Sequence, residues 1–360
     1  MEELGEPISE HGRSASISYI SAGELREFTK NAFVKLGISE KHSQIVADHL
    51  VEANLRGVDS HGVARIPYYA RGIRIGEVNA TPKIRTVVDD KGVALIDGDY
   101  ALGQVVGRYA TEVAIKKATE YGISVVGAKR ISHVGMLAYY GMMVAEKKMV
   151  GEIFTNSPPF MAAWGGRKPV LGTNPVCMAF PFNGRGAIVL DMATSESAAF
   201  KIMSAANKGE SIPTGWAVDK GGNPTTNPKE ALDGALLPFG GYKGYGLAVA
   251  VELFSSVLLG ADWSTNVKLA YHTEGGLYVQ ALDVSHFRVY TEYLRDLREV
   301  VRNIKRSGKG ESEDEILLPG EKETITAAER SAKGIPIDDS LRRELVKVSQ
   351  DLDIPISLKK

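Results

Sequence analysis

The sequence predicts a mixed α/β (α+β) protein in which helices from both chain ends form one domain around an α/β centre. Apolar residues recur at helical spacing near both ends, whereas the middle consists of short β-rich runs separated by Gly and Asp. A chain of 360 residues is long enough for two domains. We therefore expect a discontinuous helical domain of residues 1–80 and 285–360, and an α/β domain of residues 81–284.

Two helices are predicted in the first part of the chain. Ser21 and Glu24 have the spacing of a capping box, and the apolar residues that follow keep a helical period. Ser39 is suited to cap a second helix, and Gly57 stands where a C-terminal cap belongs because glycine tolerates the left-handed backbone there. This second helix leads directly into the segment Asp59-Ser60-His61-Gly62.

The middle of the chain alternates strands with helices. The β-rich runs are IRTVV, GVALIDGD, ISVVGAK, GEIFTN, VCMAFPF, GAIVLDMA and GGLYVQALD. Helical patterns cover residues 104–121 and 135–148 between these runs. Three further helices are predicted after the last run, over residues 290–305, 321–331 and 339–351.

Composition narrows the class of partner. With 43 Lys+Arg against 44 Asp+Glu, the chain lacks the excess positive charge that nucleic-acid and anionic-membrane binders use, so we expect neither partner and a small-molecule ligand instead. One cysteine, Cys177, excludes an intrachain disulfide and a paired-Cys zinc site, so we expect a cytoplasmic location and no metal site. The longest apolar run, residues 246–261, contains Glu252 and is short for a bilayer, which favours a buried helix.

The segment Asp59-Ser60-His61-Gly62-Val63-Ala64-Arg65 combines a proton-transfer group with a guanidinium. On one helix, His61 and Arg65 would share a face four residues apart, although Pro67 requires that helix to begin near Gly62 or later. The pair suits proton transfer beside a bound carboxylate. The alternative is a surface capping motif with an Arg that faces solvent.

Other candidate groups follow strands. His133 lies just beyond the run ISVVGAK, in a Gly-flanked loop like that of His61, and is either catalytic or structural. The segments 155–159 and 190–195 end two more runs with small polar residues, which suit ribose and phosphate contacts or form plain turns.

No dinucleotide-binding G-x-G-x-x-G motif follows a strand, and no P-loop is present. The glycine-rich element is PFGGYKGYGLA, in which Lys243 stands near the start of an apolar helix. Backbone N–H groups, a helix N-terminus and a Lys suit a phosphate, but a tight turn before a core helix explains the pattern equally well.

Taken in order, these pieces resemble the type-2 malate/L-lactate dehydrogenase family, which also includes sulfolactate, ureidoglycolate, diketogulonate and imine-reducing members. The resemblance is close to an archaeal malate dehydrogenase of that family and spans about residues 21–340. The segments that carry it are DSHGVARIPYY, ISHVGMLAYYG, TNSPP, GTNPVCMAFP, LDMATS, PFGGYKGYGLA and LPGE. It implies a non-Rossmann NAD(P)-binding domain with a mostly antiparallel sheet, a helical domain from both chain ends, and a homodimer with the cofactor close to the neighbouring subunit.

The family's functional positions carry over to individual residues. The positions that match cofactor contacts are Ser157, Asp191, Met192, Ala193, Lys243, Pro319, Gly320 and Glu321. The positions that match the substrate pocket are Ser60, His61, Arg65 and His133. Candidates for a second cation that holds a distal carboxylate are Arg71, Arg167 and Lys168.

The resemblance implies reversible hydride transfer between (S)-malate and oxaloacetate with NADP or NAD, with a histidine as general acid/base. Family members divide over which histidine does this; we favour His133, with His61 orienting the substrate. The alternatives are reduction of a related L-lactate, sulfolactate, diketogulonate or cyclic-imine substrate on the same fold, or a non-catalytic nucleotide-binding protein.

Overall fold

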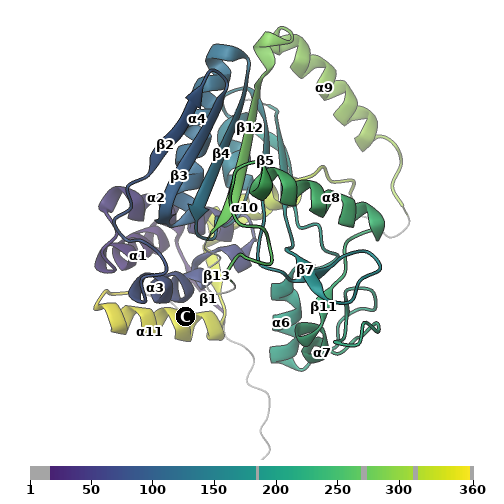
Figure 1. Cartoon of the computed structure of the whole chain (residues 1–360). Coiled ribbons are helices and arrows are strands. Elements are labelled where there is room, and N and C mark those ends of the chain that lie inside the picture. Colours follow the sequence, from purple (N-terminus) through teal and green to yellow (C-terminus); the bar gives the residue numbers. More distant parts are fainter. Residues whose placement is uncertain (1–16, 184–185, 269–273, 311–314, 357–360) are drawn as a thin grey trace, which may run out of the picture.

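The computed structural model describes residues 17–183, 186–268, 274–310 and 315–356. Its centre is a seven-stranded sheet in the order β2-β3-β4-β12-β5-β8-β9 (Figure 1). The strands of this sheet are β2 (Arg85–Asp90), β3 (Val93–Ala101), β4 (Ile123–Ile131), β5 (Met149–Thr155), β8 (Val176–Pro181), β9 (Ala187–Met192) and β12 (Gly275–Asp283). Each of the seven predicted β-rich runs supplies one of these strands.

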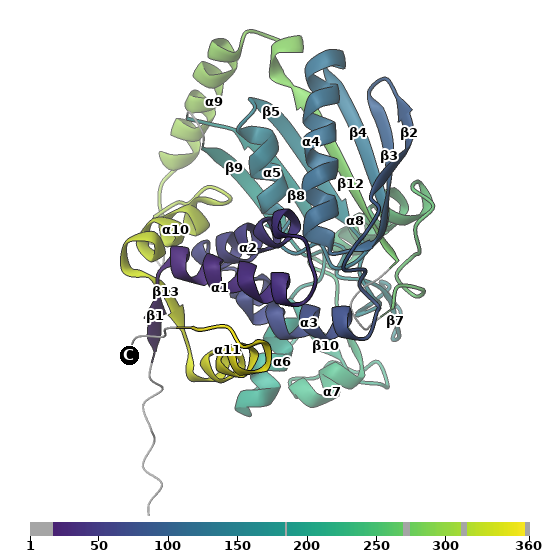
Figure 2. The same cartoon turned by 90° about the vertical axis from the view of Figure 1, so that its left-hand side faces the viewer.

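The sheet is mostly antiparallel, as expected. Only β3 and β4 run parallel, joined by helix α4 (Gly103–Tyr121) as the crossover connection that parallel strands require. The other neighbours pair antiparallel, and β12 lies between β4 and β5 although it comes from much later in the chain. α4 and α5 (Ala138–Ala145) cover one face of the sheet (Figure 2). α8 (Tyr242–Glu252) and the π-helical turn η3 (Leu253–Val257) contact the sheet through β5 and β12.

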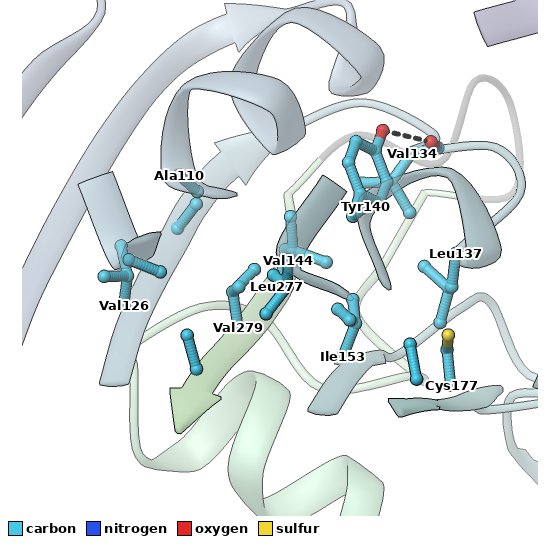
Figure 3. Close-up of a cluster of buried hydrophobic side chains, with 14 of the residues drawn as sticks. Ala110, Val126, Val134, Leu137, Tyr140, Val144, Ile153, Cys177, Leu277 and Val279 are labelled. Atoms are coloured by element: carbon cyan, nitrogen blue, oxygen red, sulfur yellow. Dashed lines mark hydrogen bonds between the residues drawn. The ribbon is translucent and has the colours of Figure 1, made fainter. Parts of the chain in front are cut away.

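Small and branched side chains fill the space between this sheet and its helices. Ala110 on α4, Val126 on β4 and Val144 on α5 are fully buried there with Val279 and Ile153 (Figure 3). Tyr140 is also fully buried, and its hydroxyl donates to the carbonyl of Val134 at 2.6 Å. The core therefore reaches the loop that follows β4 and satisfies a buried carbonyl there.

Both chain ends pack together into a second, mostly helical layer. β1 (Ser18–Ile20) pairs antiparallel with β13 (Ile335–Ile337), so residues from the two ends share one small sheet. The helices of this layer are α1 (Ala22–Lys35), α2 (Glu40–Leu55), α3 (Ile66–Arg74), α10 (Glu321–Lys333) and α11 (Asp339–Leu352). One hydrophobic cluster joins residues of α1, α2, α3 and α11. The expected helical layer from both ends is present, while the domain limits at residues 80 and 285 stay a prediction.

A third group of elements lies below the sheet in Figure 1. It is a four-stranded sheet in the order β10-β11-β6-β7, accompanied by two short helices. Its parts are β6 (Met161–Ala162), β7 (Pro169–Leu171), β10 (Ala217–Val218), β11 (Ala235–Leu236), α6 (Ala199–Lys208) and α7 (Pro228–Asp233). A separate cluster that includes Met161, Ile202 and Leu236 forms its core.

Local capping follows the sequence closely. The Ser21–Glu24 capping box is present, Ser39 caps α2, and Gly57 has a φ of 79° directly after that helix. Among the described residues, no helix is both long and apolar enough to cross a membrane.

Two helix predictions need correction. The run 246–261 is not a wholly buried helix, because α8 gives way to η3 at residue 253, and Leu253, Val257 and Leu258 are more than half exposed. The helix predicted over 135–148 is limited to α5 because Gly135 has a φ of 77°, outside the helical range. By contrast, α9 (Tyr290–Lys305) has the predicted limits; it lies away from α1, α2 and α11 in both views (Figures 1 and 2).

We expect Tyr140→Phe to lower the free energy of unfolding by about 1–2 kcal/mol, because it leaves the buried Val134 carbonyl without its donor. Urea denaturation measures this. The neighbouring Tyr139→Phe is the control, since Tyr139 is only partly buried and its hydroxyl accepts a long, 3.4 Å bond from Arg108. Equal losses in the two variants would contradict a specific role for the Val134 bond.

Candidate active site

A cavity of about 890 Å³ lies where the helical layer meets the strand ends of the large sheet. Its wall brings together ten of the predicted site residues: Ser60, His61, Arg65, His133, Ser157, Asp191, Met192, Ala193, Pro319 and Gly320. Lys243 and Glu321 are not among the residues that line it. The functional roles of all twelve stay predictions.

The segment around His61 forms two short 3-10 turns instead of one helix. They are η1 (Asp59–His61) and η2 (Val63–Arg65), and α3 begins only at Ile66, with Pro67 in its first turn as the sequence requires. Ser60 does not cap a helix; its Oγ lies 2.9 Å from His61 Nδ1. The serine therefore holds one nitrogen of the His61 ring.

Residues from both chain ends fix this segment. Arg330 of α10 binds both carboxylate oxygens of Asp59, at 2.7 and 3.0 Å. Asn54 at the end of α2 donates to Asp59 at 2.6 Å and accepts the Val63 N–H at 2.8 Å. A Cβ at Gly62 would lie 2.2 Å from the Asn54 side chain, so only glycine fits there. The position of His61 thus depends on a residue about 270 positions later in the chain.

His49 of α2 packs against the loop that carries His133 and holds it in place. The His49 ring is fully buried, and its Nε2–H donates to the Met136 carbonyl at 3.1 Å. Gly135 has a φ of 77°, and a Cβ there would lie 2.2 Å from the His49 ring. Ser132 accepts the Gly103 N–H at 3.0 Å, which joins the loop to the start of α4. The loop therefore has little freedom to move.

The two histidines meet in the cavity wall. The rings of His61 and His133 stack with 5.4 Å between centroids and an interplanar angle of 24°. Arg65 lies nearby, because its Nε donates to the Ser60 carbonyl at 2.7 Å and its guanidinium lies over the Tyr68 ring at 5.7 Å. This arrangement puts two proton-transfer groups and one guanidinium side by side.

Behind His133 lie two polar residues that sequence reasoning missed. The Tyr69 hydroxyl lies 2.7 Å from His133 Nδ1, and the Gln104 amide donates to the same hydroxyl at 2.7 Å. Burial raises the pKa of Tyr69 to about 12, although Arg65 and Gln104 act in the opposite direction. The only signal for Tyr69 was its place in the segment DSHGVARIPYY, and Gln104 carried none.

Asp191 lies near the end of β9 and also lines the cavity. Asp191 is exposed to the cavity, but the surrounding protein shields its carboxyl group from bulk water. This desolvation raises the pKa of Asp191 to about 6. The Ala138 N–H at the start of α5 donates to Asp191 at 2.7 Å and, together with Arg56, limits the shift. Asp191 therefore titrates close to the neutral range.

The segment Pro319-Gly320-Glu321 passes close to β9. Gly320 has a φ of 81°, and a Cβ there would lie 2.9 Å from the Val189 carbonyl. Glu321 does not line the cavity; it accepts the Leu318 N–H at 2.7 Å and the Lys305 ammonium at 2.6 Å. Burial opposes these two bonds, but they prevail and lower the pKa of Glu321.

The wall also fits a phosphate-bearing cofactor. Arg56, at the end of α2, is 7% exposed, lines the cavity, and donates to the Gly320 carbonyl at a long 3.4 Å. Its Nε is buried without a hydrogen-bond partner in the described structure, which a bound anion would supply. Lys201 on α6 is a third cation in the wall, after Arg56 and Arg65, whereas Arg71, Arg167 and Lys168 do not line it.

Ser157 lines the cavity, whereas Lys243 does not. Ser157 accepts the Thr173 N–H at 3.0 Å, and its own N–H donates to Asn174. Lys243 is exposed in the first turn of α8, after Gly240 and Gly241, which both have positive φ. The glycine-rich turn thus has the expected geometry without reaching this cavity.

Comparison with known proteins assigns the chain to a family. A sequence profile described as malate/L-lactate dehydrogenase matches residues 20–346. The chain belongs to this family. It is 41% identical to an L-sulfolactate dehydrogenase of Methanocaldococcus jannaschii over 89% of this chain and 94% of that protein. It is 40% identical to a malate dehydrogenase of Pyrococcus horikoshii over 92% of this chain and 94% of that protein.

Solved structures agree with the family assignment. A malate dehydrogenase from Entamoeba histolytica superposes with a TM-score of 0.91 at 29% identity, covering 94% of this chain and 99% of that chain. As a malate/L-lactate dehydrogenase family member, the protein is an oxidoreductase of hydroxy acids that works with a nicotinamide cofactor. This outcome replaces the alternative of a non-catalytic nucleotide-binding protein.

We expect His49 to make stability depend on pH. Burial lowers the pKa of His49 to about 4, against about 6.5 when unfolded, although its bond to Met136 opposes the shift. As pH falls, the His49 ring therefore takes up a proton in the unfolded chain before it does so in the folded protein, which favours unfolding. The free energy of unfolding should fall between about pH 6.5 and pH 4, by at most about 3 kcal/mol, and level off below.

Denaturation of wild type and His49→Gln across this pH range measures the effect, because only the wild type carries the titrating ring. The control is His286→Gln, since His286 is exposed. A wild-type minus His49→Gln difference that stays constant from pH 7 to pH 4 would contradict the prediction.

Proposed function

We propose that this protein interconverts (S)-malate and oxaloacetate with NADP or NAD. The observation that supports this most directly is the stacked pair His61 and His133 beside Arg65 in the wall of one cavity. The same wall contains Asp191, Met192 and Ala193 together with Pro319 and Gly320, which match the cofactor positions of the family. The residues proposed for substrate and for cofactor thus line one cavity.

In this proposal Arg65 binds the carboxylate next to the reacting carbon. Its Nε is engaged by the Ser60 carbonyl, so the two terminal nitrogens present a fork to a carboxylate. Stacking over Tyr68 keeps the guanidinium plane in place. Such positioning aligns the substrate before reaction.

The two histidines then divide the remaining work. His133 gives a proton to the substrate oxygen in reduction and takes it back in oxidation, while His61 orients the same substrate. When bound, the nicotinamide supplies or accepts the hydride. Ser60 supports His61 through its bond to Nδ1, and Tyr69 supports His133 in the same way.

A dianionic substrate is proposed because the wall contains more than one cation. Lys201 and Arg56 line the cavity in addition to Arg65, and we assign the distal acidic group of the substrate and the cofactor phosphates to these two side chains. Sulfolactate is the second candidate, since it is also dianionic and relatives at 38–41% identity are named for it. Pyruvate, with one acidic group, should react less well.

We expect purified protein to oxidise NADPH or NADH fastest with oxaloacetate, more slowly with sulfopyruvate, and slowest with pyruvate. The loss of absorbance of the reduced cofactor measures each rate, and running both cofactors settles their preference. A diketo sugar acid and a cyclic imine complete the panel. No turnover with any of these substrates would contradict the dehydrogenase proposal, and a preference for the cyclic imine would replace malate.

We expect His133→Ala to lose at least about 10² in kcat because the general acid is removed, while NADPH still binds. Fluorescence titration of NADPH measures binding separately from turnover. His61→Ala is the matched variant and should mainly raise the KM for oxaloacetate. If His61→Ala loses turnover and His133→Ala keeps it, the roles of the two histidines are reversed.

We also propose a homodimer in a reducing compartment such as the cytoplasm. Exposed apolar side chains form a stripe on η3 and the turn after it: Leu253, Phe254, Val257, Leu258 and Trp263. A second copy would cover this stripe and bring its exposed Lys243 toward the neighbouring cofactor, as the family resemblance implies. The reduced state is supported by Cys177, which is buried and free.

A further inference from the structure

The Tyr69 hydroxyl joins His133 to Gln104. It lies 2.7 Å from His133 Nδ1 and 2.7 Å from Gln104 Nε2, so one hydroxyl serves both partners. Tyr69 is 1% exposed and Gln104 is fully buried. Water therefore does not compete for these two bonds. Each proton in this Gln104–Tyr69–His133 link must be accepted by an atom of the link itself.

A hydroxyl with a single proton limits this link to two arrangements. In one, the Gln104 amide donates to Tyr69, Tyr69 donates to His133 Nδ1, and a neutral His133 carries its proton on Nε2. In the other, the amide is turned by 180°, Tyr69 donates to Gln104 Oε1, and His133 Nδ1–H donates to Tyr69. Because burial holds the pKa of Tyr69 at about 12, the phenol brings its proton to the link at neutral pH.

The surroundings do not lock either arrangement. With the amide donating to Tyr69, Gln104 Oε1 is buried and has no hydrogen-bond partner in the described structure. Turning the amide puts its NH2 group in that same place. Either orientation leaves one side of the amide unmet, so the groups around Gln104 fix neither orientation, and the partners within the link decide between them.

Only one of the two arrangements suits proton transfer. Tyr69 holds Nδ1, so a proton exchanged with a substrate passes through Nε2 of His133. In reduction, the Nε2–H bond breaks as the substrate O–H bond forms, and the imidazolium becomes a neutral ring with its proton on Nδ1. In oxidation the same steps run in reverse. Nδ1 therefore stays protonated throughout, and Tyr69 must donate to Gln104.

We propose that Gln104, acting through Tyr69, selects which nitrogen of His133 carries the proton, and that the working orientation of its amide directs Oε1 to Tyr69. Gln104 and Tyr69 are positioning residues in this proposal. The proposal rests on the role given to His133 above. It adds a residue of α4 to a site that the sequence motifs place in loops.

Charges around His133 act on the same equilibrium. In the part of the chain that the structure describes, His61 of η1, Tyr69 of α3 and Arg65 of η2 face it from the helical layer. The cavity wall adds the titratable or charged groups Arg56, Asp191, Lys201 and Glu323. The variants that test the proposal leave all of these except Tyr69 in place.

The test is ¹⁵N NMR of protein labelled at histidine, because the shifts of Nδ1 and Nε2 report the tautomer and its titration without any turnover. The His133→Asn spectrum identifies the His133 signals among those of the seven histidines. Gln104→Met keeps the length of the side chain but removes the acceptor. Tyr69 can then donate only to His133, so we expect the Nε2–H tautomer and a titration midpoint lower by about one pH unit.

Two further variants make the result specific. Gln104→Glu restores an acceptor for the Tyr69 proton and should return His133 to the Nδ1–H form with a midpoint at or above that of the wild type. In a Tyr69→Phe background, Gln104→Met should change nothing more. Thr111→Val is the control for loss of a buried polar group on α4, since the Thr111 hydroxyl donates within that helix, to the Gly107 carbonyl.

The outcomes separate this inference from the proposed function. An unchanged tautomer and midpoint in Gln104→Met, or a Gln104→Glu that behaves like Gln104→Met, would overturn the inference whatever the activity. If the spectra change as expected, Gln104→Met should also lower kcat for oxaloacetate about tenfold with little change in KM, and shift the pH–rate profile in the same direction. Expected spectra together with a fully active His133→Ala would uphold the link and remove His133 from the reaction.

Discussion

The packing of α2 against the loop that follows β4 is the constraint on which the candidate site depends. His49 fills the space that a side chain at Gly135 would occupy and donates to the Met136 carbonyl, so helix and loop cannot separate without leaving a buried polar group unmet. The same helix ends in Asn54, which holds the segment of His61. Helix α2 thus positions both the loop of His133 and the segment of His61. Because both histidines are held by the same helix, their rings can stack.

Charge is organised locally around this packing. The chain has a formal net charge of -1, so it offers no general attraction for an anionic substrate and cofactor. The cavity wall, in contrast, contains Arg56, Arg65 and Lys201 with two histidines, against Asp191 and Glu323. Burial raises the pKa of Asp191 to about 6, so its negative charge is lost at a higher pH than that of an ordinary carboxyl. Arg330 and Asp59 form an ion pair with each other and do not line the cavity, so their charges cancel and add little to its potential.

Local sequence patterns predicted most individual elements. The caps at Ser21 and Ser39 and the limits of α9 depend on contacts within a few residues, which these patterns encode directly. The seven strands were located by their β-rich composition, although their pairing is not local. The predictions failed where a distant contact decided the outcome. Gly135 lies outside the helix that was predicted to begin there, and a Cβ at this position would meet the His49 ring. The end of the run 246–261 is exposed although its apolar side chains favour burial. The insertion of β12 between β4 and β5 had no local signal at all.

By itself, the sequence determined the class of fold, the family and the residues that motifs carry, because seven short segments in one order are a property of the chain alone. Only the tertiary structure decided which side chains support them. Tyr69 and His133 are 64 positions apart, and Arg330 and Asp59 are 271 positions apart. Such pairs form when the chain ends close over the sheet, and spacing along the sequence records nothing of that approach. Motifs in the sequence already indicated His61 and His133. Only the folded structure shows that the site also involves Gln104, Arg56 and Lys201.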